Sequence, residues 1–254
     1  MARDPLNDQV PSPPAQARFW NLWNMTFLAG RSLEQNNLDA ESVRRADTVL
    51  QWLGALGPGS GRILEVGCGT GWLTKRLASY GRVTGIDLAD QAIAVARERN
   101  PDIEFIAGDV ATITLPPGEF EVIVSLETLA CLPNQADFIA SIARLLRPGG
   151  HLLLTAHHRF VYQRRSDVAP LAPGQVRRWL SRPELRRLLQ PHFHVLRLVT
   201  IIPTGDRGLL RLINSHKVNG LARLFLSERT IRRFKEALGF GTTLVVLARK
   251  RVKC

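Results

Sequence analysis

The chain has few cysteines, no long apolar run and no visible internal repeat. Its three cysteines form no Cys-x-x-Cys pair, so we expect reduced thiols and no zinc site. No stretch of 18 or more consecutive apolar residues occurs, which argues against a membrane span. The first residues lack the apolar core of a signal peptide, so we expect a cytoplasmic protein.

Acidic residues are also in short supply. Asp and Glu number 22 against 34 Lys and Arg, which gives a formal net charge of +12. A field of this sign attracts anions, RNA among them. The sequence shows no RNA-binding module, aromatic-basic stacking run or basic tail, so nucleic acid is the less favoured partner. We expect most of the arginines, many of them in pairs, to lie on solvated helix faces.

The most informative segment is a glycine-rich stretch that follows the apolar run at 63–66. Gly67, Gly69 and Gly71 alternate with other residues, and glycine tolerates positive φ and removes Cβ atoms from a turn. A ligand can therefore lie against the backbone at the carboxyl end of a strand. Two phosphate-binding patterns are disfavoured, because Trp72 replaces the third glycine of a dinucleotide fingerprint and no Lys-Ser/Thr pair completes a P-loop.

Four more strand signals follow, each with a characteristic turn or polar residue at one end. They are 83–87 ending in Asp87, 103–107 before Gly108-Asp109, 120–125 before Leu126-Glu127, and 151–155 after Pro148-Gly149-Gly150. Helical segments alternate with these strands, which predicts a parallel sheet with helices on both faces. Together with Glu65-x-Gly67-x-Gly69-x-Gly71, this order resembles the class I S-adenosylmethionine (SAM)-dependent methyltransferases.

The resemblance implies a fold, a cofactor and an activity. The expected fold is α/β, with a seven-stranded, mostly parallel Rossmann-like sheet, an N-terminal helical lid and a helical insertion before the seventh strand. SAM is the expected methyl donor and S-adenosyl-L-homocysteine (SAH) the product. Glu65 is expected near the methionine amino group, Asp87 at both ribose hydroxyls and Asp109 at the adenine amino group. The predicted cofactor-binding residues are Glu65, Gly67, Cys68, Gly69, Gly71, Asp87, Leu88, Asp109, Val110 and Leu126.

Length and a hydrophobic content of 45% fit one domain with insertions. Its expected parts are a proline-rich flexible leader (1–17), a helical segment (18–61), the SAM-binding core (62–156) and a C-terminal part (157–254).

The C-terminal part is expected to hold the acceptor pocket. Pro173 to Leu189 predicts two helical pieces separated near Pro183, and 192–202 and 241–249 predict a sixth and a seventh strand. In the resembled family the seventh strand is antiparallel and next to the sheet edge. We expect the insertion at about 203–239, with one or two helices, to determine the choice of substrate.

Acceptor-binding residues are predicted from both ends of the chain. Trp20 and Trp23 are interpreted as lid residues, with a shared buried helix face as the alternative. The remaining candidates are Glu127 after the fourth strand, Tyr162 and Arg164 after the fifth, and Arg211 and His216 in the insertion. Converging above the methyl group, the last two segments would form an apolar pocket with a cationic rim. An acceptor with an aromatic or aliphatic body and a carboxylate or phosphate would suit it.

His157 and His158, at the end of the fifth strand, are the candidates for a general base. The alternative for either one is a solvated loop histidine. Some quinone-biosynthesis methyltransferases carry Glu-x-x-Glu-His after the fourth strand, whereas this chain has Glu127-Thr128-Leu129-Ala130-Cys131. Too few hard oxygen ligands remain for Mg²⁺, so we predict methyl transfer without a metal.

The sequence therefore predicts a SAM-dependent methyltransferase that acts by in-line displacement on an O or N of a small biosynthetic metabolite. Whether that metabolite is anionic is left open, as is the choice between monomer and homodimer. An RNA methyltransferase is one alternative. The other is a SAM-binding regulatory or partner protein without turnover.

Overall fold

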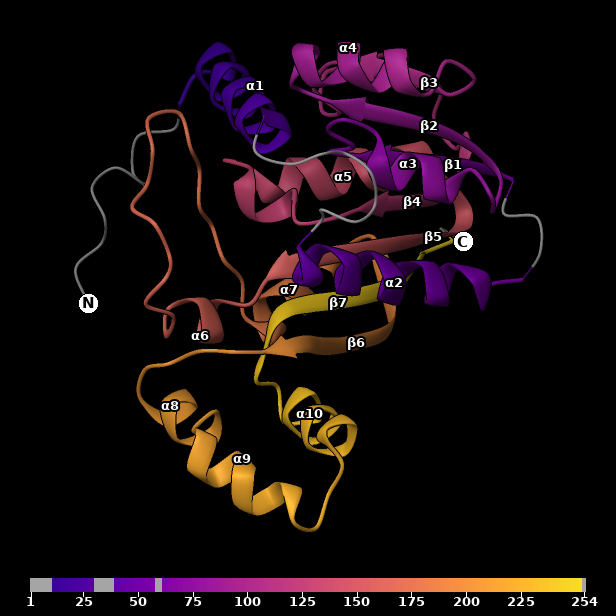
Figure 1. Cartoon of the computed structure of the whole chain (residues 1–254). Coiled ribbons are helices and arrows are strands. Elements are labelled where there is room, and N and C mark those ends of the chain that lie inside the picture. Colours follow the sequence, from indigo (N-terminus) through magenta and orange to yellow (C-terminus); the bar gives the residue numbers. More distant parts are fainter. Residues whose placement is uncertain (1–10, 30–38, 58–60, 253–254) are drawn as a thin grey trace.

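The computed structural model describes residues 11–29, 39–57 and 61–252, which form one seven-stranded sheet flanked by helices (Figure 1). The strand order is β3-β2-β1-β4-β5-β7-β6. The strands are β1 (Arg62–Val66), β2 (Arg82–Asp87), β3 (Glu104–Ala107), β4 (Phe120–Ser125), β5 (Leu146–His157), β6 (Phe193–Pro203) and β7 (Gly241–Lys250). The five strands β1 to β5 pair with their neighbours in parallel. Strand β7 runs antiparallel between β5 and β6. The predicted seven-stranded, mostly parallel sheet is confirmed.

Strand β1 lies at the point where the order of the sheet reverses. It pairs with β2 on one side and with β4 on the other, and four of its five residues are buried. In open α/β sheets the crevice for a ligand lies at such a switch point, outside the carboxyl ends of the strands. The glycine-rich segment after Val66 begins at this place.

Helices cover both faces of the sheet, as predicted. The helices that precede β6 are α1 (Pro13–Ala29), α2 (Ala40–Gly54), α3 (Trp72–Leu77), α4 (Asp90–Arg99), α5 (Gln135–Leu145), α6 (Arg159–Tyr162) and α7 (Arg182–Leu189), with a 3-10 turn at Leu129–Cys131. Leu53 of α2 and Leu77 of α3 belong to one buried apolar cluster. Ile139 of α5 and Leu189 of α7 belong to another, and each cluster also takes in side chains from the sheet.

The prediction of two helical pieces between Pro173 and Leu189 is wrong. Only α7 is helical there, and it starts at Arg182 with Pro183 in its first turn. A proline at this position loses no helical hydrogen bond, and its fixed φ suits a helix start. Ser181 and Glu184 add a capping box. Leu180 instead forms an isolated bridge with His158.

Helix α1 begins earlier than expected. Its first residue is Pro13, so the end of the predicted flexible leader is helical, while residues 1–10 lie outside the described residues. The helix is attached to α4 through Asn21, whose Nδ2 donates to Asp90 Oδ1 at 2.7 Å. The Asn21 Oδ1 in turn accepts from the backbone N of Gln91 at 3.1 Å.

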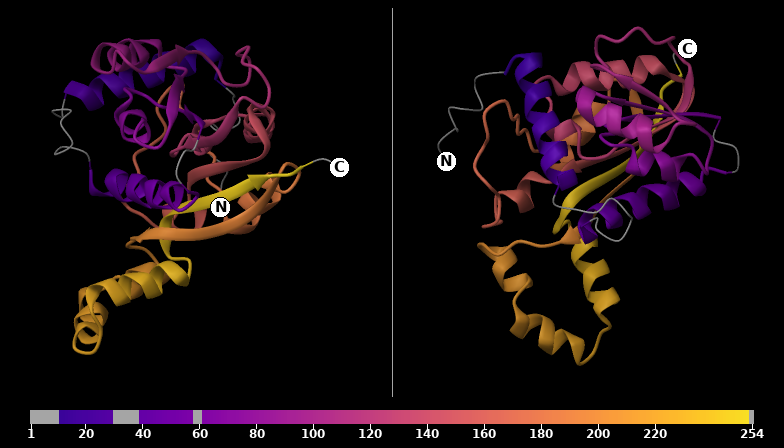
Figure 2. Two further views of the ribbon diagram at one scale, coloured as in Figure 1. Left: turned by 90° about the vertical axis from the view of Figure 1, so that its right-hand side faces the viewer. Right: turned by 45° about the horizontal axis from the view of Figure 1, so that its top comes forward.

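The predicted insertion contains three helices rather than one or two. They are α8 (Leu209–Ile213), α9 (His216–Arg223) and α10 (Glu228–Ala237). Figures 1 and 2 show them as an arm that extends from the β6 edge, away from the rest of the molecule. Helix α10 contacts β6, and α9 contacts α8 and α10. The arm is amphipathic, yet it leaves Leu221, Phe225 and Phe234 at least 64% exposed.

None of the helices in the described part of the chain is both long and apolar enough to cross a membrane.

Candidate functional site

The glycine-rich turn adopts the conformation for which its glycines are needed. Gly67, Gly69 and Gly71 have φ values of 80°, 52° and 80°. The backbone N of Gly67 donates to the Ile86 carbonyl of β2 at 2.8 Å, which fixes the turn against the neighbouring strand. A Cβ on Gly67 would lie 2.0 Å from Thr128 Oγ1. The turn therefore stays compact and presents backbone at the carboxyl end of β1.

Asp87 ends β2 beside this turn. Its two carboxylate oxygens accept from the backbone N of Gly69 and of Ala89, each at 2.8 Å. Burial raises the pKa of the Asp87 carboxyl, and the hydrogen bonds from these amides oppose the rise. Each oxygen keeps a free lone pair after accepting one amide, so the carboxylate can receive a vicinal pair of hydroxyls.

Glu65 lies deeper than the predicted contact with a methionine amino group implies. The residue is 2% exposed, and its carboxyl accepts from Thr74 Oγ1 of α3. Burial raises the pKa of Glu65 to about 8, despite the opposing hydrogen bond from Thr74. In this structure Glu65 thus ties β1 to α3 beneath the turn.

The remaining predicted cofactor residues lie around the turn. Asp109, half-buried after β3, accepts from the backbone N of Ala111 at 2.8 Å. Leu88 and Leu126 are half-buried and Val110 is buried. The Cys68 side chain points into a small core with Ile93, Ala96 and Phe105, and burial raises the pKa of its thiol.

Helix α1 lies over the glycine turn. An added Cβ on Gly69 would lie 3.2 Å from Asn24 Oδ1, and Asn24 Nδ2 donates to the Trp20 carbonyl at 2.8 Å. Trp20 and Trp23 meet edge to face, with ring centroids 5.8 Å apart. Trp23 is 47% exposed, so the alternative of a shared buried helix face is wrong. Asn21 and Asn24, which hold α1 in place, were not predicted from the sequence.

Besides the glycine turn, the site contains a hollow beside the carboxyl ends of β4 and β5. It has a volume of about 230 Å³ and is lined by Ala130 and Cys131 after β4, His157 at the end of β5, and residues of the segment 162–179. Tyr162 and Trp179 provide aromatic walls, with ring centroids 5.2 Å apart. The His157 ring meets the Tyr162 ring edge to face at 4.4 Å.

Glu127 and His157 lie in direct contact at this hollow. His157 Nδ1 lies 2.9 Å from Glu127 Oε2. Glu127 has a φ of 58°, in the left-handed region, and its backbone N donates to Thr155 Oγ1 at 2.9 Å. Burial alone would raise the pKa of the Glu127 carboxyl, but His157 and Arg45 together lower it to about 2. Glu127 is therefore a carboxylate across the physiological pH range.

Arg45 of α2 supplies the second positive neighbour. Its guanidinium Nε lies 3.6 Å from Glu127 Oε1 and donates to Thr243 Oγ1 at 3.0 Å. The Arg45 NH2 group also pairs with Glu41 at 2.7 Å, and Arg165 NH1 lies 3.5 Å from that same glutamate. Charges from α2, the β4 end and the segment after α6 thus alternate in sign around His157.

Residues 64–154 match the family described as a methyltransferase domain. A probable S-adenosylmethionine-dependent methyltransferase of Mycolicibacterium smegmatis is 33% identical over 129 residues, covering 50% of this chain and 49% of that protein. These residues form a class I methyltransferase domain. The ubiquinone biosynthesis O-methyltransferase of Thiobacillus denitrificans is 37% identical to the chain over 119 residues, 43% of this chain and 50% of the relative. The chain thus spans about half the length of these curated relatives.

Solved structures agree on the fold of the methyltransferase domain. The [4+2]-cyclase SpnF matches with a TM-score of 0.66 and 19% identity, over 96% of this chain and 98% of that one. The N-methyltransferase NodS from Bradyrhizobium japonicum, solved with SAH, matches with a TM-score of 0.59 and 18% identity, over 91% and 98%. For residues 64–154 the predicted family is confirmed, and SAM is the cofactor that this family of domains uses.

The glycine turn and Asp87 fit this cofactor. A nucleoside without phosphate needs a close backbone approach and a carboxylate for its ribose, and both are present at the carboxyl ends of β1 and β2. Asp109 stands one strand further along for the base. The positions of these residues agree with their predicted roles, which stay predictions.

Several predicted acceptor residues are not brought together in the methyltransferase domain. His158 is 5% exposed, and its Nδ1 meets the Gly241 carbonyl at 3.1 Å, so it is a structural histidine. Arg164 stacks on Phe160 at 4.2 Å. Arg211 belongs to the arm and does not line the hollow, and the side chain of His216 lies outside the described residues. The insertion extends from the β6 edge, so in the described residues it does not cover the hollow.

Sequence reasoning missed Arg45 and Glu41. Arg45 is separated from Glu127 by more than 80 residues, and Arg44-Arg45 looks like the other arginine pairs. The one available signal was the position of Arg45 next to the buried side of α2, which Ala46, Val49 and Leu53 mark at helical spacing. Within the described residues, no group of three or more His, Cys, Asp and Glu side chains is placed to hold a metal ion.

Proposed function

We propose that the protein transfers the methyl group of SAM to a hydroxyl or amine of a small planar acceptor bound beside His157. The Glu127–His157 pair carries this proposal, because a carboxylate at Nδ1 holds the imidazole in the tautomer whose Nε2 accepts a proton. Tyr162 and Trp179 would bind the acceptor ring, and Arg177 adds positive charge at the edge. The similarity to an O-methyltransferase of ubiquinone biosynthesis supports an oxygen acceptor.

The residues divide the work of the reaction between them. SAM supplies an activated methyl group, so alignment and exclusion of water account for much of the rate. His157 would take the proton of the acceptor as its oxygen or nitrogen gains the methyl group, and Glu127 would stabilise the imidazolium formed. Arg45 keeps Glu127 ionised and in place, and Glu41 in turn pairs with Arg45. None of these steps calls for a metal ion.

Replacement of His157 tests the base directly. We expect His157→Ala to lower the rate of SAH formation by about 10²- to 10⁴-fold, with SAH affinity unchanged, because the turn and Asp87 are untouched. His194→Ala, an exposed histidine on β6, serves as the matched control. The assay uses a panel of phenols, hydroxybenzoates and arylamines. If the His157→Ala variant keeps the rate and pH profile of the wild type, His157 is not the base. Catalysis would then rest on the alignment of the acceptor with SAM alone.

The alternatives are separated by the same assay. Total RNA is added at low and moderate salt, because phosphate contacts weaken as salt rises. Salt-sensitive methylation of RNA alone would replace the small acceptor by a nucleic acid. Tight SAH binding without turnover of any acceptor would favour a SAM-binding protein, since one fold can serve different functions. Turnover is expected to survive EDTA, and its loss and rescue by Mg²⁺ would contradict the metal-free mechanism.

A further inference from the structure

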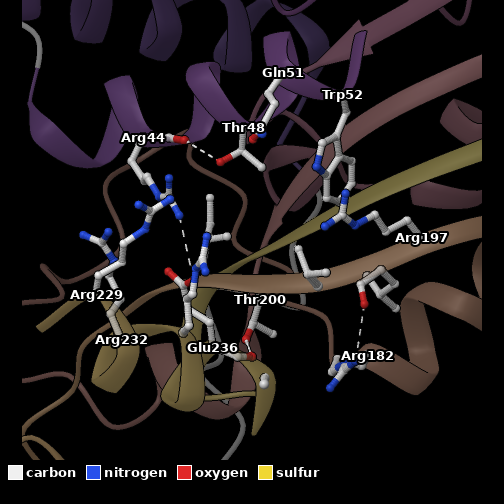
Figure 3. Close-up of a pocket in the computed structure, with 15 residues that line it drawn as sticks. Arg44, Thr48, Gln51, Trp52, Arg182, Arg197, Thr200, Arg229, Arg232 and Glu236 are labelled. Atoms are coloured by element: carbon white, nitrogen blue, oxygen red, sulfur yellow. Dashed lines mark hydrogen bonds and ion pairs between the residues drawn. The ribbon is translucent and has the colours of Figure 1, made fainter. Parts of the chain in front are cut away.

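A large groove lies apart from the hollow at His157, between α2, β6 and α10 (Figure 3). Its volume is about 720 Å³. Six arginines line it together with a single acidic residue, Glu236. They are Arg44 from α2, Arg182 from α7, Arg197 from β6, and Arg229, Arg232 and Arg233 from α10. By comparison, the hollow at His157 is lined by two arginines, Arg165 and Arg177.

Little of this charge is neutralised by the protein itself. Arg44 and Glu236 approach only to 3.8 Å, and the Arg44 Nε is buried without a hydrogen-bond partner. Arg182 donates to the Leu198 carbonyl at 3.3 Å, which leaves its charge unpaired. Among the described residues, no carboxylate forms a salt bridge with the guanidinium groups of α10 that line the groove.

The spacing of the α10 residues points these groups to one side. Arg229 precedes Arg232 and Arg233 by three and four positions, and Glu236 follows them by four and three, so they share a helix face. Figure 3 shows Arg44 reaching down from α2 toward Arg229 and Arg232 of α10. Cations of like sign on one face repel one another, and a concave wall concentrates their field toward an anion.

One arginine of the groove is held in place by stacking on an aromatic ring. The Arg197 guanidinium lies over the Trp52 ring, 4.4 Å from its centroid, and Trp52 itself is 5% exposed. A guanidinium held by stacking keeps its in-plane N–H groups for a ligand. Planar guanidinium groups bind phosphate oxygens in pairs.

From these observations we infer that the groove binds an anion with two or more linked phosphate groups. A single phosphate would satisfy one or two arginines and leave the others unpaired, whereas an oligophosphate can bridge α2, β6 and α10. The chemistry is that of free oligophosphate and of nucleoside diphosphates alike. The site is separate from methyl transfer, because Arg44 faces the groove while its neighbour Arg45 faces Glu127.

Calorimetric titration with tripolyphosphate tests this site. The Arg232→Glu/Arg233→Glu variant should bind tripolyphosphate at least about 30-fold more weakly than the wild type, because charge-assisted bonds are lost and repulsion is added. The control is Arg186→Glu/Arg187→Glu, an exposed pair on α7 with the same change in net charge. It should stay within about threefold of the wild type. Unchanged SAH affinity and circular dichroism show that both variants are folded.

Further probes identify the ligand. ADP binding tighter than pyrophosphate assigns the groove to a nucleotide, and equal affinities assign it to free oligophosphate; both outcomes support the inference. Equal weakening by the two double variants would overturn it, since attraction would then come from net charge alone. So would the absence of tripolyphosphate binding at 1 mM, or binding of single-stranded RNA that depends on Arg232 and Arg233 without any binding of tripolyphosphate or ADP.

Discussion

Charge on single residues is set by their partners rather than by their chemistry alone. Glu65 is buried in β1 and Glu127 is half-buried just after β4, yet their carboxyls have pKa values of about 8 and about 2. Glu65 has only the hydroxyl of Thr74, so its burial dominates. Glu127 has Arg45 and His157 as neighbours, and their interactions with the carboxylate outweigh the cost of burial. At neutral pH the first is mainly protonated and the second is ionised.

The raised pKa of Glu65 predicts a pH-dependent stability. The fold favours the protonated carboxyl, so its contribution is complete below about pH 4.5 and is lost as the pH rises toward 8. In the ligand-free protein, Glu65→Gln should remove this loss and stabilise the fold at pH 8 by on the order of 3 kcal/mol. Urea unfolding at pH 5 and pH 8 measures the difference. Glu98→Gln, at an exposed position of α4, should behave as the wild type does.

Asp87 is predicted to dominate recognition of the ribose. Asp87→Ala removes the acceptor for two hydroxyls and should weaken SAH binding by about 2 to 3 kcal/mol, or about 30- to 150-fold. Asp87→Asn keeps one accepting oxygen and should lose less. Asp102→Asn, exposed after α4, is the control in the same calorimetric titration. Wild-type affinity in the alanine variant would contradict the assigned role.

At the scale of elements, helix α1 is joined to the rest of the domain by few contacts. Asn21 connects it to α4 and Asn24 places it over Gly69. Trp23 stays exposed. A helix so lightly attached above a ligand site can open without disturbing the sheet.

Hydrogen exchange tests α1 as a lid. Bound SAH should slow amide exchange by at least about fivefold in both α1 and the glycine turn, because ligand and helix would close over the same backbone. Helix α10 lies outside this site and should exchange equally with and without SAH. Slowing at the glycine turn alone would leave α1 as a fixed part of the domain.

Elements were predictable where a periodic pattern and a local stop signal coincide. The strand predicted at 120–125 has the predicted bounds. The stretch before Pro183 shows apolar residues at helical spacing but is not helical, because the backbone of Leu180 pairs with the segment at His157 and Arg159 instead. Contacts made across the fold override local spacing there.

The candidate site was predictable only in part, for a related reason. Glycines and acids at strand ends are local signals, so the turn and Asp87 could be predicted. The pairing of Glu127 with His157 depends on two strands lying side by side, and the position of Arg45 depends on how α2 packs on them. No sequence spacing encodes either, and nothing in residues 203–239 indicates that the arm lies away from the hollow.

At the scale of the whole molecule, the excess of positive charge is not spread evenly. Arginines gather in the groove between α2 and α10, while around His157 positive and negative side chains alternate. The net charge of +12 is therefore a poor guide to the acceptor. The groove that collects these arginines is separate from the proposed site of methyl transfer.

The position of β7 has a consequence for how the protein is made. Of the seven strands β7 is synthesised last, yet it lies between β5 and β6, and β6 pairs with no other strand in the described sheet. On the ribosome, a nascent chain that has not reached Gly241 therefore presents open hydrogen-bonding edges on β5 and β6. At about 5 to 20 residues per second the interval is short, but open edges recruit other chains. During a translational pause before residue 241, the nascent chain would therefore depend on chaperones to protect these edges.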